Sequence, residues 1–356
     1  GDVIRNGCLI LGFFSLGMIL SGCQLPYLVK GAYHQGQILK ARKPLDEVYS
    51  DPSVSDSTKK KLQLAQEAKR FAAQNLGLDQ SDNYTSYVQL DRPYVSWVIR
   101  VAKEYRLEPH LWWFPIVGSV PYKGYFSKQE AEKAAQKFSD DEFDVLIRGV
   151  TAYSTLGWFE DPLISSMMEY PDHQLVNTVI HEMVHETIYI PSEADLNEQL
   201  ATFIGNIGTE TFYLAKEGES SPTLKKIRQI NKDRTLFSRF ITKEIKALEV
   251  WYKKQKNLSQ EAKKRRLEQI QTRFKKTVEP RLQTRFYAYF PDQELNNALL
   301  LSYKTYRSNL ENLEKLFLSL DQNFEGLLEF AKQLEQANDP QEVILQTVSQ
   351  DQRFDP

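Results

Sequence analysis

The sequence predicts a mostly helical α+β fold, in which a small sheet packs on a helix that carries an H-E-x-x-H segment and a helical C-terminal region follows. Three observations predict it. The H-E-x-x-H segment lies in an apolar stretch with helical spacing. β-Branched and aromatic residues gather just upstream, at 143–159, which favours a strand there. Beyond residue 221, apolar residues recur every three or four positions, which is typical of helices.

The stretch from Val179 to Tyr189 carries His181, Glu182 and His185 in the H-E-x-x-H arrangement. Residues four apart share one face of an α-helix, so both imidazoles can reach one Zn²⁺. Glu182 would lie beside the metal's open position and could take a proton from a water that the metal activates. Two histidines on a buried helix could instead be ordinary core residues. With five histidines in 356 residues, chance produces the pattern on the order of 0.005 times per chain, which favours a metal site.

The limits of this helix and the third ligand follow from the next residues. Asp172, after Pro171, is the expected N-cap, and Pro191 is expected to end the helix. Glu198 opens a second apolar helix, and two histidines with one glutamate form a His₂Glu catalytic zinc set. Glu193 and Asp195 are alternatives to Glu198. We favour Glu198, because Asp195 is a plausible N-cap of the second helix and Glu193 lies in the turn before it.

The first residues predict export and a lipid anchor. Both cysteines lie before residue 24, and the apolar run Cys8–Leu20, flanked by Arg5, is too short to span a bilayer but typical of a signal peptide. Leu20-Ser-Gly-Cys23 resembles the bacterial lipobox, so we expect a signal peptide at 1–22, lipidation of Cys23 and a tether at 23–56. An ordinary secretory signal or an uncleaved anchor is the alternative. No cysteine follows Cys23, so we expect no disulfide in the mature protein.

Composition and motifs exclude several classes of partner. The formal net charge is −2, which gives no indication of a nucleic-acid partner. The sequence contains no Gly-rich phosphate loop and no G-x-G-x-x-G, so no nucleotide cofactor is expected. The hydrophobic fraction of 41% is ordinary for a globular protein and allows a sizeable core.

Periodicity predicts the remaining elements. We expect a short element around Trp97–Val101 and core or loop packing for the aromatic run 111–118. The expected helices lie at 57–76 with Ser57 as cap, 127–138 with Ser127 as cap, 237–252, 267–274, 295–320 and 324–334, with a break near 257–259.

Several segments together resemble a known family. They are Ser21–Cys23, Phe114–Gly118, Tyr122–Phe126, Ala152–Phe159 with Asp161-Pro162, His181–His185, Asn197–Ala201, and Asn296–Ala298 with Tyr306. The chain resembles, roughly from Cys23 to Phe317, the bacterial family of predicted aminopeptidases, which are lipoproteins with an H-E-x-x-H zinc site. The resemblance implies a secreted, membrane-anchored metallopeptidase that binds zinc through His181, His185 and a downstream glutamate. Well-known zinc aminopeptidases hold the substrate amine with a Gly-x-Met-x-Asn segment, which this chain lacks, so both exo- and endopeptidase activity stay open.

Two further roles are expected around the zinc. Zinc peptidases of the thermolysin kind place an edge strand upstream of the H-E-x-x-H helix, where a substrate backbone can pair, and Tyr153-Ser-Thr155 is the candidate edge. A donor should also stabilise the oxyanion of the scissile carbonyl. The candidates, in falling order of preference, are Tyr306, Tyr153 and His110.

We therefore expect a zincin-like catalytic domain at 57–220 and a helical region at 221–356 that closes the cleft. The expected function is a zinc-dependent peptidase, lipid-anchored in the bacterial cell envelope, exported and facing the periplasm or the outer membrane. One alternative is a catalytically silent zinc-containing lipoprotein that binds or scaffolds envelope peptides. An intact Glu182 argues against it, since a structural zinc site needs no base. The other is an interaction module in which residues 221–334 carry the function.

Overall fold

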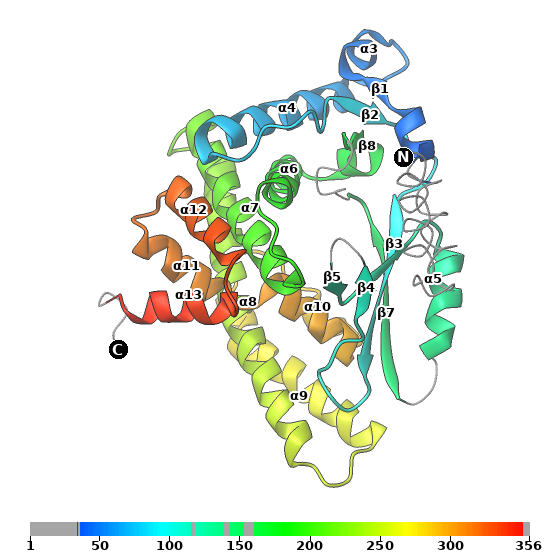
Figure 1. Ribbon diagram of the computed structural model, residues 1–356, viewed down its shortest axis with the longest axis vertical. Helices are drawn as coiled ribbons and strands as arrows, with labels where there is room; N and C mark the ends of the chain where they lie inside the picture. The colour runs from blue at the N-terminus through cyan, green and yellow to red at the C-terminus, as the bar shows by residue number, and fades with distance from the viewer. Residues whose placement is uncertain (1–33, 35, 115–117, 139–141, 153–159, 352–356) are drawn as a thin grey trace, which may run out of the picture. The chain divides into compact units, whose positions relative to one another are not determined.

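The computed structural model describes residues 34, 36–114, 118–138, 142–152 and 160–351 (Figure 1). The chain divides into two compact units, residues 1–42 and 43–356, and the second contains the H-E-x-x-H segment. The predicted signal peptide and Cys23 lie outside the described residues. Among the helices that are described, none combines the length and the apolar character needed to cross a bilayer.

The main sheet has three strands in the order β6 (Lys123–Tyr125), β3 (Ser96–Lys103) and β7 (Phe143–Val150). β3 and β7 are antiparallel and pair along their whole length, as expected for their β-branched residues. Helix α5 (Lys128–Ala135) covers one face of the sheet, and the helical body lies on the other (Figure 1). The strand predicted from residue 143 is confirmed up to Val150, while 153–159 lie outside the described residues.

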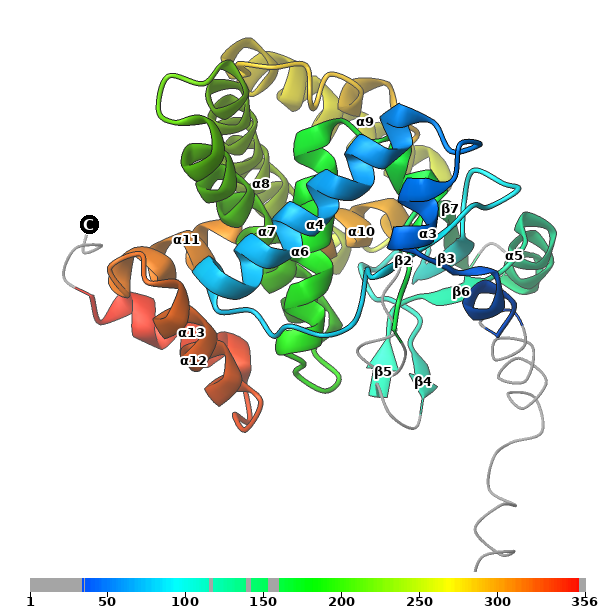
Figure 2. The same ribbon diagram turned by 90° about the horizontal axis from the view of Figure 1, so that it is seen from above.

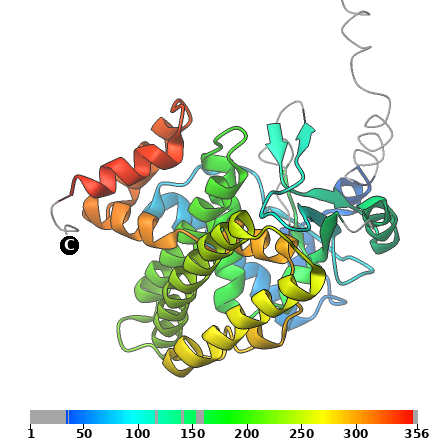
Figure 3. The same ribbon diagram turned by 90° about the horizontal axis from the view of Figure 1, so that it is seen from below.

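A hairpin of β4 (Trp112–Phe114) and β5 (Gly118–Val120) projects beside the α6–α7 turn (Figures 2 and 3). Ser119 N donates to Ser192 Oγ of that turn over 3.4 Å. Gly118 has a φ of 74°, and a Cβ there would lie 2.3 Å from Ser192 Oγ, so only glycine fits. Core or loop packing was predicted for the run 111–118. Leu111 and Trp113 do not belong to the core, because the hairpin stands away from it and leaves their side chains exposed.

The short strands and α3 (Leu45–Ser50) flank the long helix α4 (Asp56–Leu76). β2 (Ser86–Val88) pairs with β1 (Lys43–Pro44) and with β8 (Leu163–Ile164). The helix predicted at 57–76 is confirmed, but its cap is Ser55, not Ser57. The Ser55 hydroxyl accepts a hydrogen bond from Thr58 N at 3.1 Å, one of the backbone donors left free in a first helical turn.

The C-terminal half is helical, which confirms the mostly helical α+β class. Its helices are α8 (Pro222–Lys254), α9 (Gln260–Thr277), α10 (Asn297–Arg307), α11 (Leu310–Ser319), α12 (Phe324–Leu334) and α13 (Pro340–Ser349). The break near 257–259 is confirmed. The single helix predicted at 295–320 is wrong: Asn309 adopts a left-handed φ of 58°, which divides the run into α10 and α11. Helix α13 was not predicted.

Candidate metal centre

Helix α6 (Asp172–Thr187) carries the H-E-x-x-H segment between α4 and α7 (Ala194–Glu217), as Figure 1 shows. Its apolar residues are buried, as the periodicity predicts. Two predictions about its ends need correction. Asp172 is the first helical residue and not the N-cap; its carboxylate lies 2.6 Å from Lys61 Nζ. The helix ends at Thr187, before Pro191, because Ile188 is already extended.

Three side-chain atoms meet where α6 faces the start of α7. Nε2 of His181 and Nε2 of His185 lie 3.1 Å apart. Oε2 of Glu198 lies 3.2 Å from the first and 3.4 Å from the second. Ligands about 2.0–2.1 Å from a tetrahedral zinc ion lie about 3.3 Å from one another. The three atoms therefore fit three corners of one zinc site.

The state of Glu198 supports this fit. Its side chain is buried, and Oε2 has no hydrogen-bond partner of ordinary geometry among the described residues. Burial alone would raise the pKa of Glu198, but His185 and His181 hold it well below its ordinary value. Against the effect of burial, Glu198 raises the pKa of His185 to about 9. The group thus combines a fixed negative charge with two imidazoles, a donor set that suits a divalent cation.

The two alternative third ligands, Glu193 and Asp195, do not reach the histidines. Glu193 and Asp195 do not belong to the group of ligand atoms that converge within 4.8 Å. Asp195 was predicted to cap α7, and this is wrong: the N-cap is Glu193, whose side chain makes no capping hydrogen bond. Asp195 Oδ1 instead accepts a hydrogen bond from Thr305 Oγ1 of α10 at 2.5 Å.

Two features that were not recognised from the sequence hold Glu198 in place. Asn197 clamps the turn before it, since its Oδ1 accepts from Ile190 N at 2.9 Å and its Nδ2 donates to Ile190 O at 2.7 Å. Gly208 lets α7 approach both α4 and α6, because a Cβ there would lie 2.8 Å from Leu76 Cδ1 of α4 and 3.2 Å from Ile180 Cγ2 of α6. α7, which carries Glu198, therefore packs closely on α6, which carries the two histidines.

A pocket of about 330 Å³ opens beside His181 and Glu182. Its walls come from β3 and β7, from α6, and from α10, which contributes Tyr306. Burial raises the pKa of Glu182, which makes its carboxylate a better base near neutral pH. Burial also raises the pKa of Tyr306, so its phenol stays protonated and can donate a hydrogen bond.

The other two predicted donors, Tyr153 and His110, are not among the described residues that line the pocket. Tyr153 lies outside the described residues. His110 is not among the pocket residues: its ring packs against Trp112 and Phe138, with centroid distances of 4.7 and 5.1 Å. Several polar residues that line the pocket were not recognised in the sequence, among them Arg100, Arg148, Tyr170 and Asn177. The alternation of side chains along the strands could have placed Arg100 and Arg148 on one face of the sheet, but it does not tell which face meets α6.

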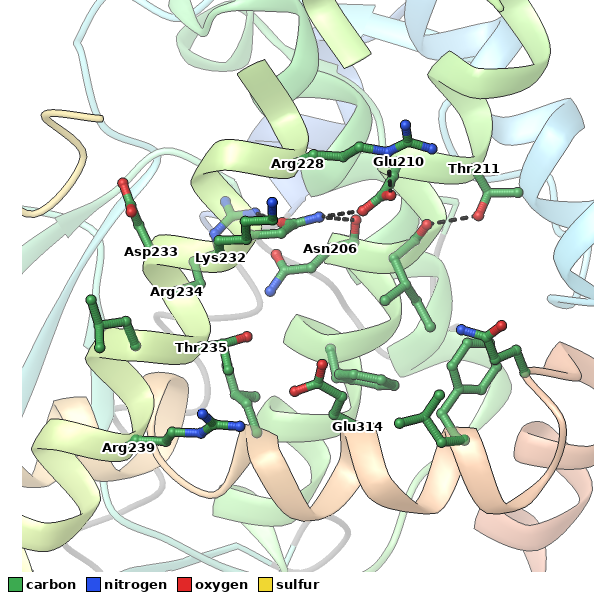
Figure 4. A pocket seen from close by; sticks show the side chains of 18 of the residues that line it. Asn206, Glu210, Thr211, Arg228, Lys232, Asp233, Arg234, Thr235, Arg239 and Glu314 are labelled. Carbon is green, nitrogen blue, oxygen red and sulfur yellow. Dashed lines mark hydrogen bonds and ion pairs between the residues drawn. The ribbon is translucent and has the colours of Figure 1, made fainter. Parts of the chain in front are cut away.

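A larger hollow, of about 660 Å³, lies between α7, α8 and α11 (Figure 4). Two of the arginines that line it form ion pairs with glutamates. Arg228 Nε lies 2.9 Å from Glu210 Oε1, as Figure 4 shows, and Arg239 pairs with Glu311. None of the three residues whose ligand atoms converge, His181, His185 and Glu198, lines this hollow, so it is a weaker candidate for catalysis than the pocket beside His181.

The fold and the triad define a mostly helical α+β protein in which two histidines and a glutamate could hold one metal ion. The model of the family described as "Putative aminopeptidase" matches residues 26–344, so the chain belongs to this family. The family description points to a peptidase. No curated protein and no solved structure matches the chain.

Proposed function

We propose that the protein is a zinc-dependent peptidase, held at the bacterial cell envelope by a lipid on Cys23. The observation that carries the catalytic part is the spacing of His181, His185 and Glu198, whose ligand atoms lie 3.1–3.4 Å apart. These three residues would hold the zinc ion. Bound zinc would polarise the scissile carbonyl and lower the pKa of a water molecule.

Glu182 would be the general base. It lies one residue from His181 and lines the same pocket, and burial raises the pKa of its carboxyl, which suits a group that accepts and returns a proton. It would take a proton from the attacking water and then deliver it to the leaving amine. A purely structural site needs no such group, which favours an enzyme over a silent scaffold.

Tyr306 and strand β7 would orient the substrate. Tyr306 lies across the pocket from α6 on a different element, α10, and its protonated phenol can donate to the carbonyl oxygen as negative charge develops. β7 is an edge strand of the described sheet, and Gly149–Ala152 line the pocket. An extended substrate backbone could pair with this edge.

The helical C-terminal region would close the cleft. Ser302 and Tyr306 of α10 line the pocket, and Gln199 of α7 donates to Lys304 O at 3.1 Å. This contribution supports a single catalytic assembly over a separate interaction module. The lipobox-like Leu20–Cys23 supports anchoring, with envelope peptides as the substrates.

The test is peptide hydrolysis by the zinc-loaded protein, with Glu182→Gln as the variant. The substitution keeps the size of the side chain and removes the base, so turnover should fall by about 10² or more, while zinc content stays at the wild-type level. Glu186→Gln is the matched control, because Glu186 lies one turn along α6, accepts from Ser81 Oγ at 2.6 Å and does not line the pocket. Equal turnover in the Glu182 variant and the wild type would remove Glu182 from the mechanism.

A further inference from the structure

The sheet presents two guanidinium groups to the pocket beside the triad. In the β3–β7 pair, Val98 faces Arg148 and Arg100 faces Leu146. Residues two apart on a strand, and residues opposite each other across it, share one face. Both arginines and their apolar neighbours line the pocket. The pocket wall opposite α6 is therefore cationic.

Arg100 is buried, with 6% of its surface exposed, and is only partly satisfied. Nη1 donates to Thr305 Oγ1 at 3.1 Å, and the guanidinium carbon lies 5.1 and 5.4 Å from the ring centroids of Tyr122 and Tyr306. Nη2 has no hydrogen-bond partner within the described part of the chain. Leaving a buried charged donor unpaired costs free energy, so an acceptor at this position would be strongly favoured.

Arg148 adds a second positive charge at the exposed side of the same wall. Among the described residues it has no ion-pair partner. Glu182 is the one carboxylate among the pocket residues, and the proposed mechanism uses it as the base. A substrate ammonium would find no other acidic partner there, whereas an anionic group would find two arginines.

We propose that this pocket binds a carboxylate of the peptide substrate through Arg100 Nη2 and Arg148. The inference rests on the proposed peptidase function for the reaction at the neighbouring triad. Arginine is well suited to the task, because its planar fork donates two hydrogen bonds to a carboxylate. At about 330 Å³ the pocket is at the small end of ligand sites, so it suits one peptide end or one side chain.

Two sources can supply this carboxylate: the free C-terminus of a short peptide, or an Asp or Glu side chain. The binding test uses the full-length Glu182→Gln protein with its metal, so that the ligand is not consumed. Four peptides of equal length are compared: a free acid, its C-terminal amide, an amide that contains Glu, and the same amide with Gln. We expect at least about tenfold tighter binding of a carboxylate peptide than of its neutral partner. The acid–amide pair reports the C-terminus, and the Glu–Gln pair reports a side chain.

Arginine variants in the same background separate this pocket from direct coordination by the metal. The quantity compared is the dissociation constant of a neutral peptide divided by that of its carboxylate partner. Arg148→Gln, at an exposed position, should bring this ratio close to one. Arg100→Lys, which loses the free Nη2, should lower the ratio several-fold. Arg106→Gln is the charge-matched control, because Arg106 is exposed, pairs with Glu108 and does not line the pocket. The control should keep the wild-type ratio. If Arg100→Lys does not fold, Arg148→Gln decides.

Equal binding of all four peptides would overturn the inference, and so would a preference that survives in both arginine variants, as expected for a carboxylate on the metal. Hydrolysis of the same peptides by the wild type is measured separately. If none is cleaved while the arginine-dependent preference holds, the peptidase proposal fails and the carboxylate site stands. If all four peptides are cleaved at equal rates and bound equally, the carboxylate site fails and the peptidase proposal stands.

Discussion

Thr305 Oγ1 donates a hydrogen bond to Asp195 Oδ1 at 2.5 Å and accepts one from Arg100 Nη1 at 3.1 Å. These bonds join α10 to the first turn of α7 and to β3. They engage the Asp195 carboxylate away from His181 and His185. Asp195, one of the two alternatives to Glu198 as a metal ligand, therefore has a structural role. Substitutions of Asp195 and Glu198 should accordingly have different effects.

Glu198→Ala should lower zinc affinity by at least about tenfold, because it removes the carboxylate that lies within 3.4 Å of both imidazoles. Asp195→Ala should keep the metal and lower the free energy of unfolding by about 1 kcal/mol, the scale of one lost hydrogen bond. Metal analysis after dialysis and urea unfolding measure the two effects. Glu193→Ala serves as a second control. Retention of zinc by the Glu198 variant, with loss in the Asp195 or Glu193 variant, would contradict the assignment.

The features that the sequence could predict are those fixed by neighbours in the chain. His181 and His185 share a helix face because they are four residues apart, and helical spacing alone places them together. Ser127 caps α5 as predicted, since its hydroxyl accepts from Glu130 N three residues on. The strand at Phe143–Val150 follows from its β-branched residues.

The features that could not be predicted depend on distant partners. Asp195 looks like a helix cap in the sequence, but its actual partner, Thr305, lies 110 residues away. Arg100 stands in an apolar strand without any local indication of a role, and its partner Thr305 is 205 residues away. The apolar spacing predicts one helix that continues past Asn309, but the left-handed backbone of this single residue interrupts the helix there.

Tyr306→Phe should lower kcat by about 10² and leave KM nearly unchanged, because a donor to the developing oxyanion acts mainly in the transition state. The phenol is neutral throughout the working pH range, since burial raises its pKa, so the loss should be the same at each pH. His110→Gln is the comparison variant, as His110 packs with Trp112 away from the pocket residues. Steady-state kinetics from pH 6 to 8 measure both. A drop in the His110 variant alone would reverse the order of the two donors.

Cys23→Ala should move the protein from the membrane fraction to the soluble exported fraction. Leu20–Cys23 resembles a lipobox and is the predicted site of lipid attachment, and the described helices offer no alternative span. Detergent-free fractionation of cells that express each form measures the change. Ser21→Ala, which keeps the cysteine, is the control and should stay with the membrane. Unchanged association of the Cys23 variant would contradict lipid anchoring.

The stability contributed by Glu104 should fall as pH rises. Lys263 Nζ lies 2.9 Å from Glu104 Oε1 and 2.7 Å from Asp144 Oδ2, so the buried carboxyl group of Glu104 and the partly buried one of Asp144 share one ammonium. Asp144 Oδ2 also accepts from Asn297 N at 2.6 Å, which leaves Glu104 the less favourably placed of the two. Burial and the hydrogen bond with Asp144 raise the pKa of Glu104.

A carboxyl group whose pKa is raised by folding stabilises the protein fully below its unfolded pKa, about 4.3, and this contribution is lost as pH rises through the folded value. The free energy of unfolding of the wild type, relative to Glu104→Gln, should therefore decline from about pH 4 upward, by at most about 1.4 kcal/mol for each pH unit. Urea unfolding of both proteins from pH 4 to 7.5 measures this difference. Glu108→Gln, which removes a nearby exposed charge without contact to Lys263, is the control. If the difference instead grows with pH, attraction to Lys263 outweighs burial, and Glu104 is a stabilising anion at neutral pH.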